Sequence, residues 1–374
     1  MRALCVGAGV LVGVMVGVAA PARVEAQGSA DQRAQADEQK SRRELGWTVL
    51  PGAWFSTDRG LGVSLSGLLY LPLDADETKP SELGLVGIVT TRGDNVLRLA
   101  PVLRFERHGY QIDGRFEVAR RGGTYYGVGN DTDADAAEDF RRFKLVTSGN
   151  VLRRWRRGVH VGLAWDLTWR RALELDDDAD ELASGRVRGV DAGVLVGLGA
   201  VARLDTRDRV YAPTRGTLTE ASAFVYSGYL GSDEDFARLS LDARAYVPIA
   251  TGHVLAVHAL ASARSGAPPF DLLASAGDTW FLRGIAGGRM RDRHLVGAQI
   301  EYRSPMWWRL GLVLFGATGR VGHRLSELAD APWRTAAGVG LRFAAKREDH
   351  VHIRFDVGFS ADGYQAYINL REAF

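Results

Sequence analysis

The chain has 374 residues, of which 46% are hydrophobic and 25% are charged, and its formal net charge is +2. A net charge this close to zero argues against a nucleic-acid-binding protein. The single cysteine, Cys5, lies close to the N-terminus, so a framework of disulfides is excluded.

The N-terminal segment has the pattern of a secretory signal. Arg2 supplies a positive start, an apolar run follows to Ala20, and Val24-Glu25-Ala26 offers a small-x-Ala cleavage site. We therefore predict a signal peptide over 1–26. The polar stretch 27–44 is predicted to be a short, disordered periplasmic tail, too short for a folded periplasmic domain.

From residue 45 onward, apolar and polar side chains alternate with a period of two, which is typical of β-strands. Near the C-terminus, Val351, Ile353 and Phe355 share one face, and His352 and Arg354 share the other. Charges of both signs recur in mid-strand, and the strands run to about ten residues. Both features favour a barrel with lipid outside and a polar lumen inside over a soluble sandwich with one wet face.

Sixteen strands are predicted, at residues 48–56, 60–72, 82–92, 95–107, 109–120, 140–153, 158–172, 187–203, 216–228, 236–249, 252–264, 294–304, 309–321, 334–345, 349–360 and 363–374. Residues 45–374 thus form an all-β, 16-stranded antiparallel transmembrane barrel of outer-membrane type. With both ends periplasmic, the longer loops 121–139, 173–186, 266–293 and 322–333 lie outside the cell. Pro101 lies inside a predicted strand and, without an N–H group to donate, requires an irregular hydrogen-bond ladder there.

The predicted last strand ends on an aromatic residue. Tyr364, Ile368 and Leu370 share one face of this strand, and Phe374 closes it. We predict that these four residues form an assembly signal for the barrel-assembly machinery of a Gram-negative host. That machinery is the first expected partner.

Four short motifs occur along the predicted barrel. They are Tyr125, Tyr126, Gly127, Gly129 and Asn130 in an outer loop; Asp205, Arg207 and Asp208 followed by Pro213 and Gly216 in a periplasmic turn; Leu282-Arg283-Gly284-Ile285; and Glu301-Tyr302-Arg303. In this order and spacing they resemble the BamA/TamA superfamily of outer-membrane insertases and transporters, also called the bacterial surface antigen family. The resemblance covers about residues 45–374, the barrel alone.

The resemblance implies that the sixth extracellular loop folds back into the lumen. Its Arg283, followed by Gly284, would pair there with Glu301, since a guanidinium in a narrow lumen must be paired to offset its desolvation. The alternative is an ordinary solvated loop arginine. The family also carries Phe-x-Asp on the next strand, where this chain has Phe315 and Ala317, so the second acid is missing at that place.

Other polar clusters are expected to be structural. Asp205, Arg207 and Asp208 could be mistaken for a catalytic group, but we expect the acids to accept backbone N–H bonds and Arg207 to bridge them. The acidic run that starts at Asp131 lacks the glycine and distal glutamate of an EF-hand. The histidines show no metal-ligand spacing. No metal, cofactor or catalytic residue is predicted, and the chain is not expected to be an enzyme.

The resemblance implies a role in inserting or translocating membrane proteins or lipids at the bacterial outer membrane, through the seam between first and last strands. Family members with that role carry polypeptide-binding domains before the barrel, which 27–44 cannot hold. A separate periplasmic protein is therefore an expected partner, beside outer-membrane lipid and lipopolysaccharide. The alternatives are a plugged channel or structural barrel without a client, and less favoured, an outer-membrane hydrolase. The client, the state of the pore and the oligomeric state are left open.

Overall fold

The computed structural model describes residues 46–57, 59–71, 73, 81–106, 109–176, 179–210, 212–346, 351–370 and 372–374. The predicted signal peptide and periplasmic tail lie outside these residues. Within the part of the chain that the structure describes, no helix is long and apolar enough to cross a membrane.

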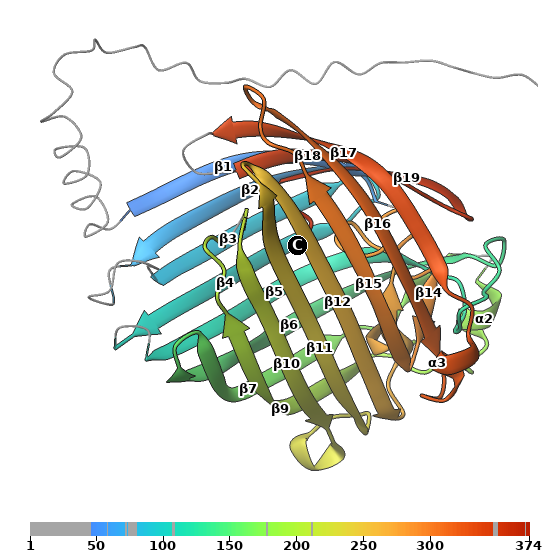
Figure 1. Ribbon diagram of the computed structural model, residues 1–374. Helices are drawn as coiled ribbons and strands as arrows, with labels where there is room; N and C mark the ends of the chain where they lie inside the picture. Colours follow the sequence, from blue (N-terminus) through green and yellow to red (C-terminus); the bar gives the residue numbers. More distant parts are fainter. Residues whose placement is uncertain are drawn as a thin grey trace, which may run out of the picture. The chain divides into compact units, whose positions relative to one another are not determined.

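Sixteen antiparallel strands close into one barrel, as predicted (Figure 1). They are β1 (Gly46–Ser56), β2 (Gly60–Leu71), β3 (Ser81–Thr90), β4 (Asn95–Phe105), β5 (Tyr110–Tyr125), β6 (Glu138–Arg156), β7 (Val159–Arg170), β9 (Gly193–Asp205), β10 (Gly216–Tyr226), β11 (Phe236–Ala250), β12 (His253–Gly266), β15 (His294–Arg303), β16 (Leu310–Gly322), β17 (Arg334–Lys346), β18 (Val351–Ser360) and β19 (Gly363–Leu370). Each strand pairs with its neighbour in the sequence, and β1 closes on β19.

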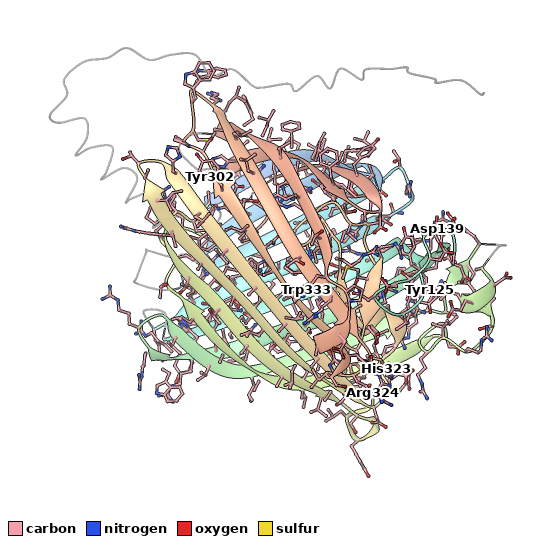
Figure 2. All side chains as sticks on the ribbon, turned by 45° about the vertical axis from the view of Figure 1, so that its right-hand side comes forward. Tyr125, Asp139, Tyr302, His323, Arg324 and Trp333 are labelled. Carbon is pink, nitrogen blue, oxygen red and sulfur yellow. The ribbon has the colours of Figure 1, made fainter. Side chains whose placement is uncertain are left out.

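The loops contain only short elements. These are β8 (Glu174–Leu175), which pairs with β6, the two-stranded sheet of β13 (Ala274–Ala276) and β14 (Met290–Asp292), the helices α2 (Asp180–Ala183) and α3 (Glu327–Asp330), and the 3-10 turns η1 (Gly228–Leu230) and η2 (Phe270–Leu272). Tyr302 on β15 lies at the opposite end of the barrel from His323 and Arg324, which follow β16 (Figure 2).

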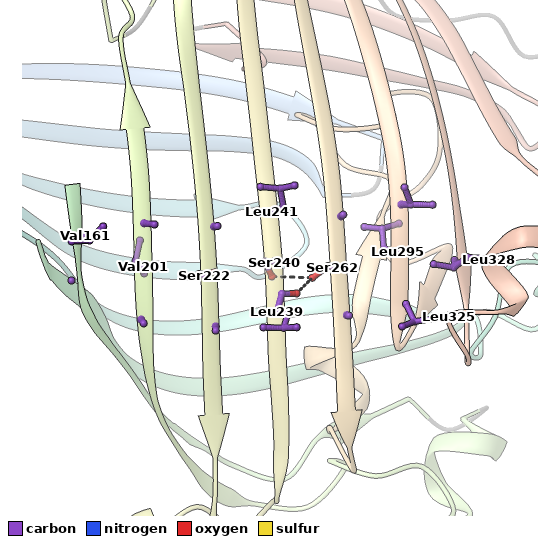
Figure 3. Close-up of a pocket in the computed structure, with 18 residues that line it drawn as sticks. Val161, Val201, Ser222, Leu239, Ser240, Leu241, Ser262, Leu295, Leu325 and Leu328 are labelled. Atoms are coloured by element: carbon purple, nitrogen blue, oxygen red, sulfur yellow. Dashed lines mark hydrogen bonds between the residues drawn. The ribbon is translucent and has the colours of Figure 1, made fainter. Parts of the chain in front are cut away.

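The period-two alternation sets which side chains face outward. On β11, Leu239 and Leu241 face outward and are 58% and 43% exposed, while Ser240 between them bonds Ser262 of β12. Figure 3 shows the two leucines among the residues that line an apolar groove on the outer surface, which extends from β7 to β15. An outer face of this kind suits hydrocarbon rather than water.

The predicted boundaries are wrong for the β5–β6 pair, for β9 and for the last strand. β5 extends to Tyr125, beyond the end of the predicted strand 109–120. β6 starts at Glu138, before the start of the predicted strand 140–153. β9 starts at Gly193 instead of 187, because Val187 and Val190 pack against a cluster around Phe270.

The third wrong boundary is the last strand, which ends at Leu370 and does not continue to Phe374. Pro101, in contrast, has the irregular ladder that was predicted. The β4–β5 register passes from Leu99 opposite Phe116 directly to Val102 opposite Asp113. A side chain at Gly114 would lie 2.9 Å from the Pro101 ring, so the glycine makes room for the proline.

The sixth loop, between β12 and β15, folds into the lumen as predicted. Its apolar side chains Phe281, Leu282 and Ile285 are almost fully buried and form a cluster with Leu295 of β15 and Val321 of β16. Burial of this apolar area holds the loop inside the barrel.

Candidate functional site

The tip of the sixth loop lies directly against strand β18. Gly284 has φ +113°, and an added Cβ there would lie 2.9 Å from the Gly358 carbonyl carbon. A Cβ on Gly358 would in turn lie 2.4 Å from the Arg283 carbonyl oxygen. The backbones can approach this closely only because both residues are glycine.

Arg283 makes its contacts at the tip of this loop. Its Nη1 lies 2.6 Å from the Asp356 carboxylate, and its Nη2 bonds Glu301. The guanidinium also lies 3.7 Å from the centroid of the Phe315 ring. All three charged side chains are 0% exposed. The structure thus brings Arg283 together with Glu301, and the reading of Arg283 as a solvated loop arginine is wrong.

Asp356 supplies the second acid, which the sequence analysis did not find. Its only signal was its place on the polar face of the alternating run that became β18. Ala317, where the resemblance puts an acid, belongs instead to the apolar cluster that contains Leu282 and Val321. The second carboxylate of this chain therefore lies on β18, next to the closing strand, and not on β16.

Further ion pairs extend this contact into a buried network. Arg303 Nε lies 2.8 Å from Glu301, and Arg342 Nη1 lies 2.6 Å from Asp356. Arg342 also reaches Glu372, at 2.6 Å. Buried charges are destabilising unless they are paired, so each member depends on the others.

Residues 372–374 turn into the lumen instead of continuing β19. The Phe374 ring lies 5.1 Å from the His258 ring, and its carbonyl accepts a 2.8 Å bond from Arg303. Tyr364, in contrast, faces outward and is 64% exposed, and Ile368 stays on β19. The expectation that Phe374 closes the last strand is therefore wrong. The role of this segment as an assembly signal stays a prediction.

Among the described residues, the closing seam is much shorter than any other strand pair in the barrel. There, β1 pairs with β19 through Phe55 opposite Ile368 and Ser56 opposite Tyr367 alone. The neighbouring strand pairs β1–β2 and β18–β19 contain eleven and eight opposed residue pairs. Because β19 ends at Leu370, the stretch 46–54 of β1 has no ladder partner on β19 among the described residues.

The outer-loop motif ties the sixth loop to the barrel wall. The Tyr125 ring packs edge-on against Phe270, at 5.4 Å between centroids. Gly129 N–H donates to the Arg291 carbonyl at 2.8 Å. Asn130 accepts from Val321 N–H at 3.1 Å. Two more members of the motif contribute: the Tyr126 ring lies 5.5 Å from the Arg289 guanidinium carbon, and Gly127 has φ +89°.

A second anchor of the sixth loop was not predicted from the sequence. Asp271 is flanked by three cations from the barrel wall, with Lys144 at 2.6 Å, Arg170 at 3.1 Å and Arg142 at 3.2 Å. No role was predicted from the sequence for Asp271 or for these three cations. Asp271 fixes the descending part of the loop, and Arg283 fixes its tip.

Both acids of the periplasmic turn accept backbone N–H bonds, as expected. Arg207 makes a two-pronged ion pair with Asp205, at 3.0 and 3.1 Å, and the expectation that it bridges both acids is wrong. Asp208 accepts bonds from the backbone N–H groups of Thr214 and Arg215, at 2.9 and 3.2 Å. Partial burial raises the pKa of Asp208, but the bonds from Thr214 and Arg215 outweigh it, and the pKa is lowered.

The end of the turn needs a glycine. Gly216 has φ +100°, and a Cβ there would lie 2.3 Å from the Thr206 carbonyl oxygen. Pro213 contributes its carbonyl, which accepts a 3.4 Å bond from Arg303. The turn thus touches the same buried network as the tip of the sixth loop.

The sequence matches the Omp85 superfamily domain over residues 109–366. No curated protein matches the chain. Among solved structures, BamA from Haemophilus ducreyi lacking POTRA domains 1–3 is 16% identical, with a TM-score of 0.60 over 87% of this chain and 70% of that chain.

Two further solved structures are also similar. CdiB from Acinetobacter baumannii is 10% identical, with a TM-score of 0.55 over 91% of this chain and 68% of its own. CdiB from Escherichia coli is 11% identical, with a TM-score of 0.55 over 91% of this chain and 70% of its own. At these identities the likeness shows the fold alone.

Proposed function

We propose, because the chain belongs to the Omp85 superfamily, that it assists the insertion or translocation of membrane proteins or lipids at the bacterial outer membrane. The observation that carries this proposal is the seam. Over 46–54, strand β1 presents a backbone edge that no described residue of β19 covers. In a bilayer each unsatisfied backbone group costs several kcal/mol, so such an edge favours the arrival of another strand or the entry of lipid.

The buried network at the loop tip would keep the other side of the seam in place. Gly284 N–H donates to the Tyr367 hydroxyl of β19 at 3.2 Å, and Ser360 Oγ of β18 donates to the Gly284 carbonyl at 2.8 Å. The sixth loop is thereby attached to both strands of the closing hairpin. This attachment supports a seam in which β1 is free to open while β18 and β19 stay fixed.

The surroundings fit the outer membrane. Exposed apolar side chains on the outer face, such as Leu163 at 73% and Val63 at 56%, would contact lipid tails and the acyl chains of lipopolysaccharide. The host assembly machinery would place the barrel in the membrane, and a separate periplasmic protein would deliver clients to the seam.

Closing the seam covalently tests the proposal. Phe55→Cys with Ile368→Cys, in a Cys5→Ser background, puts two thiols at directly opposed positions. The matched control is Val63→Cys with Val89→Cys, an opposed pair on the fixed β2–β3 ladder. Each barrel is reconstituted in liposomes, where the folding of a denatured small outer-membrane barrel and the transfer of labelled phospholipid are followed.

The reduced barrels are expected to accelerate folding of the client or transfer of lipid. Oxidation should abolish this acceleration in the barrel with the seam pair only, and reduction should restore it. Unchanged acceleration after complete oxidation would contradict the proposal. A steady ion conductance without either acceleration would favour the channel.

A further inference from the structure

The inner wall formed by β2, β3 and β4 carries a group of apolar side chains. Leu68, Val86, Ile88 and Val102 point inward and are half-buried, while the outward Val89 beside them is 54% exposed. Charged side chains at inner positions of the other strands include Asp113, Asp166, Arg203, Asp242, Glu301, Arg303, Arg342, Arg354 and Asp356. Apolar residues lie there as well, in the buried cluster around Leu152 and Leu195. The wall has charged residues at its margin, because Glu82 of β3 lies opposite Val102 and β4 carries Arg98 and Arg104 on its inner face.

The strand register makes these side chains one continuous surface. Val86 lies opposite Ser66 of β2, and Ile88 lies opposite Val96 of β4. The wall continues onto β1, the first strand of the seam. There the Trp54 ring covers Gly62, since a Cβ on Gly62 would lie 2.3 Å from it. The surface therefore reaches the seam through uncharged residues.

The sixth loop does not cover this wall with its apolar residues. Phe281, Leu282 and Ile285 are buried instead against β15 and β16, through Leu295 and Val321. Half-buried apolar side chains lack part of the free energy that full burial would give them. They would regain it with an apolar ligand.

A cluster of cations adjoins the apolar wall. Arg98 of β4 lies opposite Val86 on one side and opposite Glu117 of β5 on the other. Glu117 pairs with Arg98 at 2.6 Å and with Arg121 at 3.0 Å. Arg115 lies on the same inner face of β5 and is exposed. Three arginines around one carboxylate leave an excess of positive charge, which suits an anionic group.

We propose that this wall and its arginine cluster bind a phosphorylated glycerolipid that enters from the seam. The acyl chain would lie along Leu68, Val86 and Ile88, and the phosphate would contact Arg98 and Arg115. A lipid fits better than a polypeptide because the backbone of β2 and β3 is already paired on both sides and offers only side chains. The inference rests on the proposed function and deepens it, since it names lipid as the substrate class.

Fluorescence quenching by brominated lipid tests the site in the full chain. A bimane label is placed at Ile88→Cys on the wall, in a Cys5→Ser background, in liposomes that contain phosphatidylglycerol brominated in mid-chain. Val89→Cys, which faces the bilayer, is the positive control. Ser222→Cys, on the inner face of β10, is the negative control. We expect quenching of about two-fold at Ile88, strong quenching at Val89 and none at Ser222.

The arginines test recognition of the headgroup. Arg98→Gln with Arg115→Gln should raise the amount of brominated phosphatidylglycerol needed to quench Ile88 by about ten-fold. Arg156→Gln, which removes an exposed arginine at the end of β6, should change nothing. Brominated phosphatidylcholine should quench Ile88 less than phosphatidylglycerol does.

Three results would overturn the proposal. The label at Ile88 could stay unquenched, or its quenching could be the same after replacement of both arginines. In the third result, a denatured barrel polypeptide shields the label and lipid does not. The readout is independent of activity. A barrel that is quenched at Ile88 but inactive with an open seam would uphold the lipid site and refute the proposed function.

Discussion

Arg283, at the tip of the sixth loop, lies 2.6 Å from the carboxylate of Asp356, and both side chains are fully buried. Asp356 is on β18, the neighbour of the closing strand, so the pair attaches the loop to the hairpin that forms one side of the seam. The resemblance of the sequence to its family placed a second acid at 317, on β16. The observed position couples the loop to the closing hairpin.

The buried pair Arg283–Glu301 should behave non-additively. Arg283→Ala leaves two buried carboxylates short of one partner, so a loss of about 3–5 kcal/mol of unfolding free energy is expected. Glu301→Ala should cost a similar amount, and the double variant less than the sum of the two. Denaturant unfolding in liposomes measures all three. Strict additivity would contradict the contact.

Ala317→Asp should be destabilising in this chain. Ala317 is 9% exposed in an apolar cluster, and Arg283 already has two carboxylates. A buried carboxylate without a partner should cost on the order of 1–3 kcal/mol or more. The heat-modifiable gel shift reports the folded fraction, with Ala317→Ser as the conservative control. A folded fraction equal to that of the unmodified chain would mean that Arg283 can turn towards β16.

Gly358→Ala should displace the tip of the sixth loop. The added methyl would lie 2.4 Å from the Arg283 carbonyl oxygen, so backbone must shift, at roughly 1–3 kcal/mol. Gly316→Ala is the matched control, because a Cβ there meets nothing within 4 Å. Protease sensitivity of the loop should rise in Gly358→Ala only. Equal sensitivity in both variants would be evidence against the close approach.

The periplasmic turn should lose stability in acid. The pKa of Asp208 is lowered in the folded chain, so its contribution is present above the ordinary aspartate pKa of about 3.9 and is lost as the pH falls through the folded value. The stability difference between the unmodified chain and Asp208→Asn should therefore shrink as the pH is lowered from 7 towards 3. A difference that is constant with pH would show that the carboxylate does not stabilise the turn.

The assembly-signal prediction can be separated from packing. Phe374→Asp should leave the chain in the periplasm if the host machinery reads this residue. Phe374→Leu retains an apolar contact with Tyr246 and His258 in the lumen. Fractionation of cells measures both variants. Equal outer-membrane levels for the two would refute the signal.

The strands could be predicted from the sequence because alternation is a local property. In 351–360 the outward Phe355 and inward Asp356 already mark the two faces. The partner of Asp356 could not be predicted, since it depends on how deep the sixth loop descends. The inward turn of 372–374 was missed because the alternation from Tyr364 to Leu370 gives no sign of the long-range pair between Glu372 and Arg342. Val187 and Val190 fitted a strand pattern equally well and instead pack against a loop.

Hydrogen exchange of β19 tests the central claim, that the sixth loop holds the closing hairpin. The measurement compares backbone amides of β19 in the unmodified chain and in Asp356→Asn, with β10, on the far side of the barrel, as an internal reference. Loss of the Arg283–Asp356 pair should speed exchange in β19 by about ten-fold or more and leave β10 unchanged. Equal exchange of β19 in both proteins would contradict the claim.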